Sequence, residues 1–127
     1  MADEQASKTV LLVDDDRDIL TAMKTALGDL KVNILTAPDG NEAIRQAEEG
    51  KPDLVVLDMM LPKRSGFLVM EKLKRGKKRT DLPRIIMITG NQGSRHKSYA
   101  ESLGVDLYLN KPFRMEKLIE SVKKLLG

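Results

Sequence analysis

The sequence predicts an α/β fold in which five helices cover a single doubly wound sheet of five parallel strands. Two observations support this prediction: short apolar runs recur at fairly regular intervals along the 127 residues, and a helical pattern follows each run. Repeated strand–helix alternation is typical of a three-layer sandwich with right-handed crossovers. A chain of this length can bury one core and is too short for two.

The runs that we expect to form the strands are Val10–Val13, Ile34–Ala37, Leu54–Leu57, Ile85–Ile88 and Val105–Leu109. The first, third and fourth runs are continuously apolar and rich in valine, isoleucine and leucine. Strands that are buried on both faces of a parallel sheet have this composition.

The first helix is predicted to begin after Asp16, which can cap it, and to stop at Gly28. Three further helices are predicted over Asn41–Glu49, Ser65–Arg75 and Ser94–Leu103, and a glycine follows each of them. The last helix has the clearest helical periodicity. Its apolar face consists of Met115, Leu118, Ile119, Val122, Leu125 and Leu126.

The composition is typical of a soluble globular protein, with 41% hydrophobic and 32% charged residues. No apolar run approaches the roughly 18 residues of a membrane span, and the first residues lack the apolar segment of a signal peptide. The chain has no cysteine, which excludes disulfides and thiolate metal sites. We expect a cytoplasmic protein that does not associate with membranes.

The net charge of +3 reflects a local excess of cations. They are Lys72, Lys74, Arg75, Lys77, Lys78, Arg79 and Arg84. Such a run could attract a nucleic acid or an acidic partner, but no aromatic residue is interleaved with it as a base-stacking surface requires. We interpret the run as a solvated helix end with its loop, and we expect no direct binding of nucleic acid.

Polar side chains follow several of the predicted strands. Asp14 and Asp15 follow the first strand, Asp58 the third, Thr89 the fourth and Lys111 the fifth. These positions are the carboxyl ends of parallel strands, which is the edge where open α/β sheets place their ligands. Simple capping of exposed strand ends would not require this chemically complete set of side chains.

Carboxylates that are packed together repel by about 4 kcal/mol per pair at about 4 Å and an effective dielectric constant of about 20. This repulsion favours a proton or a hard divalent cation, and an all-oxygen site suits Mg²⁺ or Mn²⁺. A lysine can neutralise charge on a transferring phosphoryl group, and a threonine hydroxyl can bind it. The pattern predicts a phosphoryl group on Asp58, formed by nucleophilic attack of its carboxylate.

Four motifs occur in order at strand ends: LLVDDD (Leu11–Asp16), PDLVVLDMMLP (Pro52–Pro62) with Gly66, IIMITG (Ile85–Gly90) and YLNKPF (Tyr108–Phe113). Together they resemble the receiver domains of response regulators, the CheY-like family. The resemblance implies the flavodoxin/CheY-like strand order 2-1-3-4-5. It also implies a receiver domain over residues 8–127, preceded by a flexible segment over residues 1–7.

The resemblance implies roles for the matching acids. Asp14 and Asp15 look like the pair that holds Mg²⁺, and Asp58 looks like a third metal ligand and the phosphoacceptor. The backbone carbonyl of Met60 looks like a further metal ligand. The long apolar side chain of Met60 stands where polar residues are frequent in the family. The lifetime of the phosphoryl group therefore does not follow from the resemblance. For Asp16, a helix cap is a better interpretation than a metal ligand.

The resemblance also implies a switch. Thr89 and Lys111 look like the hydroxyl and ammonium groups that bind the phosphoryl group, and Tyr108 looks like the aromatic ring that moves inward with Thr89. The bond between Lys111 and Pro112 is a candidate cis peptide. Gly90 stands where alanine is usual, which should leave the following loop over residues 91–93 freer.

For the chain as a whole, the resemblance implies a phosphotransfer protein that catalyses only its own phosphorylation and dephosphorylation. A sensor histidine kinase or a histidine phosphotransfer domain would supply the phosphoryl group, and an effector that the sequence does not identify would respond. The responding surface would be the fourth helix, fifth strand and fifth helix. His96 is expected on an exposed helix face without a role. The sequence is compatible with a monomer and with a phosphorylation-dependent dimer. It is also compatible with a stand-alone protein and with part of a longer regulator.

Other interpretations fit less well. Asp14, Asp16 and Asp18 have the spacing of an EF-hand loop, but Ile19 and Thr25 stand where that loop needs glycine and glutamate. A flavodoxin needs a phosphate loop rich in serine, threonine and glycine where the acids stand. An aspartyl phosphatase of the haloacid dehalogenase type stays as an enzyme alternative, although such enzymes usually have a longer core and a cap. A receiver-like module that no longer accepts phosphate would lack a key residue, and none is missing.

Overall fold

The computed structural model describes residues 8–61, 63, 65–78, 81–90 and 94–126, without the side chains of residues 94–96. The expected flexible segment over residues 1–7, the loop over residues 91–93 and the side chain of His96 lie outside the described residues. Among the helices that are described, none is both long and apolar enough to cross a bilayer.

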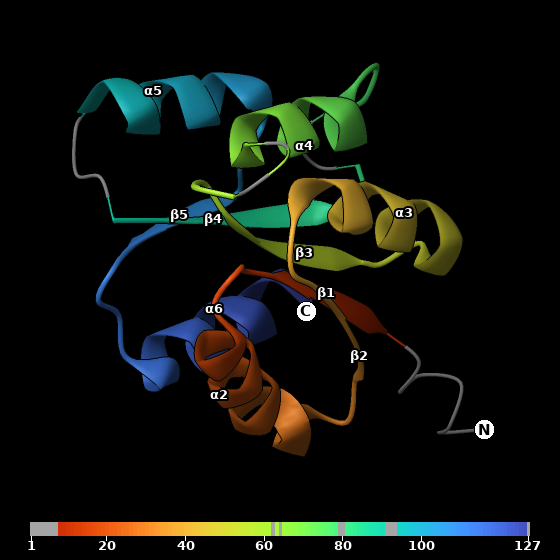
Figure 1. Cartoon of the computed structure of the whole chain (residues 1–127), viewed down its shortest axis with the longest axis vertical. Helices are drawn as coiled ribbons and strands as arrows, with labels where there is room; N and C mark the ends of the chain where they lie inside the picture. Colours follow the sequence, from red (N-terminus) through yellow and green to blue (C-terminus); the bar gives the residue numbers. More distant parts are fainter. Residues whose placement is uncertain (1–7, 62, 64, 79–80, 91–93, 127) are drawn as a thin grey trace.

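Five parallel strands form one sheet in the order β2-β1-β3-β4-β5, which confirms the predicted topology (Figure 1). The strands are β1 (Thr9–Val13), β2 (Asn33–Ala37), β3 (Leu54–Asp58), β4 (Arg84–Thr89) and β5 (Leu107–Asn110). The central strand β3 is buried along its whole length. Helices cover both of its faces, so a continuous apolar run is required there.

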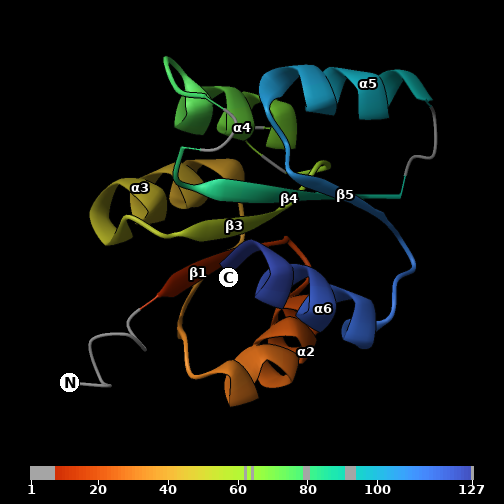
Figure 2. The ribbon, with the colours of Figure 1, turned by 180° about the vertical axis from the view of Figure 1, so that it is seen from behind.

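The helices form a layer on each face of the sheet, as Figure 1 and Figure 2 show from opposite sides. One layer contains α2 (Arg17–Leu27) and α6 (Met115–Leu126), and the other contains α3 (Gly40–Gly50), α4 (Gly66–Lys74) and α5 (Ser94–Leu103). A short 3-10 helix, η1 (Gly28–Leu30), follows α2 directly, because Gly28 keeps a right-handed helical conformation.

Side chains of each strand alternate between the two faces and build two apolar cores. In β1, Leu11 and Val13 pack on the side of α3 and α4, whereas Val10 and Leu12 pack on the side of α2 and α6. Met59, directly after β3, belongs to the first core and is 2% exposed. Its side chain therefore serves as a packing group.

Side-chain caps begin three of the helices. Asp16 Oδ1 accepts hydrogen bonds from the backbone N–H groups of Asp18 at 2.9 Å and Ile19 at 3.3 Å, which confirms that Asp16 is a helix cap. Asp39 caps α3 and Ser65 caps α4 in the same way. Each cap satisfies an N–H group that has no partner within its own helix.

Several element boundaries differ from the prediction by one or two residues, and two of the differences have a clear cause in the backbone. Helix α3 continues through Gly50, which we expected to end it, and Lys51 supplies the left-handed residue instead, with a φ of 44°. Strand β5 does not include Val105, because the N–H of Val105 still bonds to the carbonyl of Ala100 in α5. Gly104, with a φ of 102°, makes that helix end possible.

Gly66 allows α4 to approach the end of β3. Its N–H donates to the carbonyl oxygen of Met59 at 2.8 Å. A Cβ atom at this position would overlap the backbone carbonyl oxygen of Asp58 and would lie 2.7 Å from Met59 Cα. Only glycine therefore fits without a shift of the backbone that carries Asp58.

We expect Gly66→Ala to lower the free energy of unfolding by about 2–3 kcal/mol, because the added methyl group must displace backbone atoms. Gly28→Ala is the matched control, since its Cβ would meet nothing within 4 Å and its φ of −59° suits alanine. The control should be neutral or stabilise by up to about 1 kcal/mol. Urea denaturation followed by circular dichroism measures both effects, and equal effects would contradict the close approach at Gly66.

Candidate functional site

An acidic cluster lies at the carboxyl edge of the central strands. Asp14 follows β1 directly, and Asp58 is the last residue of β3. The parallel pairing of Val13 with Leu57 carries these two acids to neighbouring positions at the same edge. One carboxylate oxygen from each of Asp14, Asp15 and Asp58 lies within 4.8 Å of the other two. The structure thus brings the three predicted metal acids together.

Two of these three carboxylates are buried. Asp14 is 0% and Asp58 is 3% exposed, whereas Asp15 is exposed. The backbone N–H of Asp16 donates to Asp14 Oδ1 at 2.9 Å, and the N–H of Met60 donates to Asp58 Oδ1 at 3.0 Å. The turns after both strands are therefore folded around the carboxylates, which fixes the direction of each acid before any ligand binds.

Burial makes Asp58 harder to ionise. Loss of solvent raises the pKa of the Asp58 carboxyl above its ordinary value of 3.8, and the neighbouring charge of Asp14 raises it further. The Met60 N–H and the Lys111 ammonium group act in the opposite direction without cancelling the rise in this pKa. Ionised Asp58 is thus short of positive charge around it, and a bound cation would supply that charge.

Lys111 faces the cluster from the end of β5. Its ammonium nitrogen lies 3.3 Å from Asp14 Oδ2 and 3.3 Å from Asp58 Oδ2. Its backbone N–H donates to the carbonyl of Thr89 at 2.7 Å, and its bond to Pro112 is cis, as predicted. Burial lowers the pKa of Lys111, but the charges of Asp58 and Asp14 outweigh this effect and raise it overall.

Thr89 and Tyr108 stand on neighbouring strands beside the cluster. Thr89 ends β4 and is 0% exposed, and Tyr108 on β5 packs against the core next to it. Burial raises the pKa of Tyr108, and the nearby Thr89 hydroxyl partly offsets the rise. Among the described residues, no contact of the buried Tyr108 hydroxyl meets hydrogen-bond geometry. Both residues predicted for the switch therefore lie together at this edge.

Met60 contributes to the site through its backbone and leaves its side chain outside. The N–H bonds to Asp58, while the side chain is 68% exposed. The proposed role of the Met60 carbonyl as a metal ligand stays a prediction. The predicted effect of this side chain on the lifetime of a phosphoryl group also stays a prediction.

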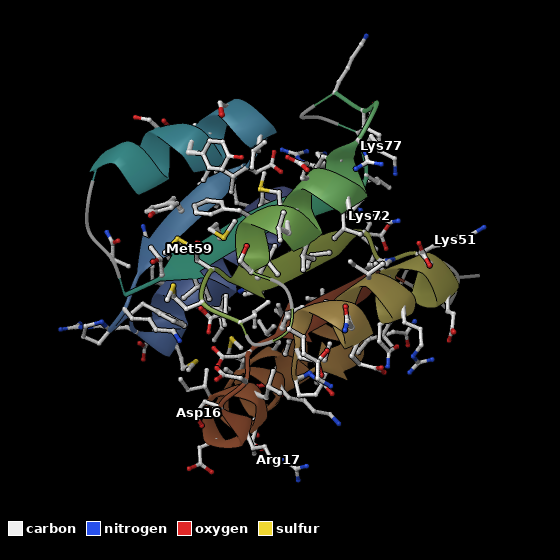
Figure 3. The ribbon with its side chains drawn as sticks, turned by 45° about the horizontal axis from the view of Figure 1, so that its top comes forward. Asp16, Arg17, Lys51, Met59, Lys72 and Lys77 are labelled. Atoms are coloured by element: carbon white, nitrogen blue, oxygen red, sulfur yellow. The ribbon has the colours of Figure 1, made fainter. Side chains whose placement is uncertain are left out.

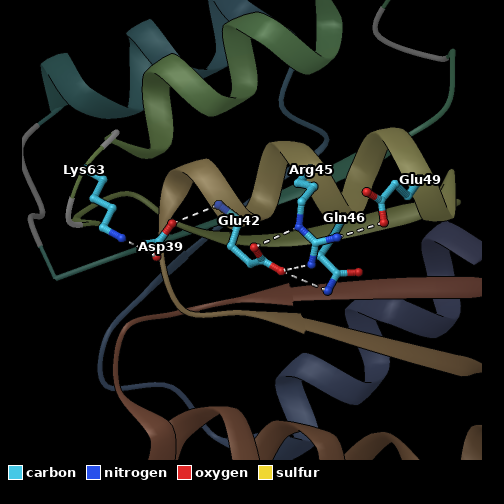
Figure 4. Close-up of polar contacts among 6 residues, drawn as sticks. All are labelled: Asp39, Glu42, Arg45, Gln46, Glu49 and Lys63. Atoms are coloured by element: carbon cyan, nitrogen blue, oxygen red, sulfur yellow. Dashed lines mark hydrogen bonds and ion pairs between the residues drawn. The ribbon is translucent and has the colours of Figure 1, made fainter.

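One feature that the sequence analysis missed joins the loop after β3 to the start of α3. Lys63, with a φ of 68°, lies 3.5 Å from Asp39 Oδ2 (Figure 4). Asp39 Oδ1 accepts a hydrogen bond from the N–H of Glu42 at 2.8 Å, and this bond is the main reason why the pKa of Asp39 is lowered. The Asp39-x-x-Glu42 spacing is a helix-start signal that the sequence does contain.

The remainder of this polar network runs along the surface of α3. Arg45 forms ion pairs with Glu42 and with Glu49, and Gln46 donates to Glu42 (Figure 4). Exposed pairs of this kind contribute little to stability. These pairs lie along α3. Asp39, which caps the start of α3, also contacts Lys63 in the loop that follows Asp58.

The donor set fits Mg²⁺. Asp14, Asp15 and Asp58 offer carboxylate oxygens only, and two of these acids are buried beside each other. Hard divalent cations prefer such oxygen ligands and relieve the repulsion between the acids. A thiolate or imidazole metal centre is not formed here, since the described cluster contains aspartates alone.

Comparisons with known proteins agree with this geometry. The family model described as the response regulator receiver domain matches residues 10–123. The alkaline phosphatase synthesis transcriptional regulatory protein PhoP of Bacillus subtilis is 38% identical over 120 residues, which are 94% of this chain and 49% of PhoP. The phosphate regulon transcriptional regulatory protein PhoB of Pseudomonas aeruginosa is 35% identical over 119 residues, which are 94% of this chain and 52% of PhoB.

Solved structures give the same result. A CheY-like receiver domain protein from Methanospirillum hungatei has a TM-score of 0.81 at 30% identity, covering 94% of this chain and 93% of that protein. The chemotaxis response regulator CheY4 of Vibrio cholerae has a TM-score of 0.84 at 26% identity, with 94% and 98% covered. This chain spans about half the length of PhoP and PhoB. On its sequence, fold and strand-end residues, it belongs to the receiver domain family of two-component response regulators.

Proposed function

We propose that Asp58 accepts a phosphoryl group from a phosphohistidine of a sensor histidine kinase or a phosphotransfer domain. The observation that carries this proposal is the position of Asp58, a carboxylate that is 3% exposed between two further acids and Lys111. A carboxylate oxygen of Asp58 would form the new bond to phosphorus. The bond between phosphorus and the donor nitrogen would break, and its electron pair would return to the imidazole.

Mg²⁺, or Mn²⁺, would neutralise charge on the transferring group when it is held by Asp14, Asp15 and Asp58. Asp14 and Asp58 are already oriented by backbone N–H groups, so the protein loses little freedom when the cation binds. Lys111 would exchange part of its contact with the acids for a phosphoryl oxygen. The hydroxyl of Thr89 would bond to another phosphoryl oxygen.

The proposed response starts at Thr89 and ends on the surface of α5, β5 and α6. Movement of Thr89 toward the phosphoryl group would free space for the ring of Tyr108, whose hydroxyl is buried and poorly bonded in this state. Phosphorylation would thus shift an existing equilibrium between two conformations. Tyr108 also lines a hollow of about 530 Å³ with Phe113 and Lys117, so its movement would alter a surface that a partner can contact.

Several further features of the function stay predictions. The domain over residues 8–127 would act on no substrate other than its own phosphoryl group, and an effector would read the response. A cytoplasmic location and the absence of nucleic-acid and membrane binding by this domain are proposed in the same way. The domain would be either a monomer or a dimer that forms on phosphorylation. Gly90 and Met60 would set the phosphoryl lifetime.

We expect Asp58→Asn to reduce Mg²⁺-dependent labelling by acetyl phosphate to background, because the amide lacks a nucleophilic carboxylate. Mass spectrometry of the intact protein detects the added phosphoryl group. Asp29→Asn is the control, since Asp29 lies on η1 away from the cluster and should leave labelling unchanged. Persistent labelling of the Asp58 variant would identify another acceptor and refute the proposal.

Lys111→Ala should retain Mg²⁺ binding, because the three acids remain and lose a competing positive charge. It should also uncouple phosphorylation from the response, so that the resonances of Thr89 and Tyr108 no longer shift when acetyl phosphate is added. Nuclear magnetic resonance titrations measure both properties. A response equal to that of the unaltered protein would contradict the role assigned to Lys111.

In metal-free buffer, Asp58→Asn should raise the free energy of unfolding near neutral pH. The pKa of Asp58 is raised by folding, so the native state binds this proton more readily than the unfolded state and loses stability as the pH rises through the native pKa. The increase in the free energy of unfolding that Asn produces should shrink as the pH falls toward 3.8, the ordinary pKa of aspartate, because Asp58 becomes protonated in the native state. Urea denaturation at a series of pH values, with a chelator present, tests this; a gain that grows on acidification would contradict it.

A further inference from the structure

The run of cations at and beyond the end of α4 divides into two groups in the structure. Lys74 is 5% exposed, and its ammonium group donates to the carbonyl oxygens of Asp81 at 2.6 Å and Pro83 at 3.1 Å. Arg84 Nε donates to Asp106 Oδ1 at 2.8 Å. These two cations serve the fold, which corrects the interpretation of the whole run as a solvated segment.

Three other cations of the run border a hollow of about 490 Å³ between the ends of α3 and α4. They are Lys72, Arg75 and Lys77, and Lys51 joins them from the end of α3. Figure 3 shows Lys51, Lys72 and Lys77 on the same side of the molecule. Among the described lining residues, Glu48 is the single acid.

The charge of this rim is not compensated within the part of the chain that the structure describes. No described acid forms an ion pair with Lys51, Lys72 or Arg75. The ammonium group of Lys77 donates to the carbonyl oxygen of Leu82 at 3.0 Å, which is a neutral acceptor. Four cations with one acid between them create a positive potential over the hollow.

The floor of the hollow is apolar and is held in place by the fold. We use the term floor for its apolar lining residues, which are Ala47, Pro52, Leu73, Leu82 and Pro83. Leu82 is 53% exposed, so it offers apolar surface beside the cations that line the hollow. The loop that carries it is fixed by the ammonium groups of Lys74 and Lys77, which bond to three of its carbonyl oxygens. A preformed floor lowers the entropy cost of binding.

We propose that this hollow binds an acidic segment of a partner polypeptide, with an apolar side chain of the segment on Leu82 and its carboxylates at the rim cations. The excess of rim cations selects an anionic occupant, and the apolar floor selects one that also carries an aliphatic side chain. A nucleic acid fits less well, because the described lining residues include no aromatic ring for base stacking.

The hollow lies at the edge of the sheet opposite to the acidic cluster. Pro52 lies before β3 and Pro83 before β4, whereas Asp58 and Thr89 end these strands. A strand of this length separates the two edges by about 20 Å. The proposal therefore does not rest on phosphorylation of Asp58, and the two can fail independently.

The test uses the unaltered chain, labelled for nuclear magnetic resonance, and four fluorescent probes. The first is a peptide of about ten residues in which glutamates flank a central pair of leucines. The second has serine in place of leucine, the third has lysine in place of glutamate, and the fourth is a single-stranded oligonucleotide. We expect the first peptide to bind about tenfold more tightly than the others at about 0.15 M ionic strength. It should also shift the amide resonances of Lys51, Lys72 and Lys77.

Variants then test each part of the hollow. The double variant Lys51→Glu/Lys72→Glu should weaken binding of the first peptide by about tenfold or more. The control Lys123→Glu, which reverses an exposed cation on α6, should not weaken it. Leu82→Ser should abolish the preference for the leucine peptide over the serine peptide. Circular dichroism establishes that each variant is folded.

Three results would overturn the proposal. They are equal affinity of the double variant and the control, tighter binding of the oligonucleotide, and resonance shifts that lie away from the hollow. A measurement without variants is also decisive. Affinity of the unaltered protein for the first peptide must fall as salt increases, because the rim charges are exposed and screened, and an affinity that salt does not change would equally overturn the proposal.

Discussion

The attraction between one ammonium group and two buried carboxylates governs the functional edge of this receiver domain. Lys111 lies at the same distance, 3.3 Å, from an oxygen of Asp14 and of Asp58. Both acids are almost completely buried, so their repulsion is poorly screened and the lysine charge is shared between them. A cation or a phosphoryl group that enters this cluster must change both contacts at once. A site in which one lysine contacts two carboxylates is suited to convert binding or modification into a conformational change.

The rest of the fold positions the side chains that make these contacts. Parallel register brings the ends of β1 and β3 together, and helix caps and turns then fix the direction of each acid. Gly66 lets α4 pack closely against the backbone of Asp58 at the end of β3. Lys63 ties the following loop to Asp39 at the start of α3. These contacts position Asp14 and Asp58, whereas the proposed response would involve Lys111 and Thr89.

Two clusters of opposite charge lie at opposite edges of the same sheet. The carboxyl edge gathers acids around Asp58, and the amino edge gathers Lys51, Lys72, Arg75 and Lys77 around an apolar floor. This separation follows from the architecture, because the helices that return the chain end at the amino edge of the sheet. It gives one small domain two surfaces with different chemistry. The proposed phosphorylation at the first edge would not compete for space with the proposed partner at the second.

The sequence by itself determined the strand and helix pattern, the acids at the strand ends and the family, because periodicity and strand-end chemistry are local properties. Only the tertiary structure decided which groups meet. Lys111 reaches Asp14 across 97 residues, and the hollow joins the end of α3 to the end of α4 and to the segment before β4. It also buried Lys74, although Lys72 and Arg75 of the same run of cations are exposed. Such contacts depend on strand order, register and the path of each loop, which no local pattern encodes.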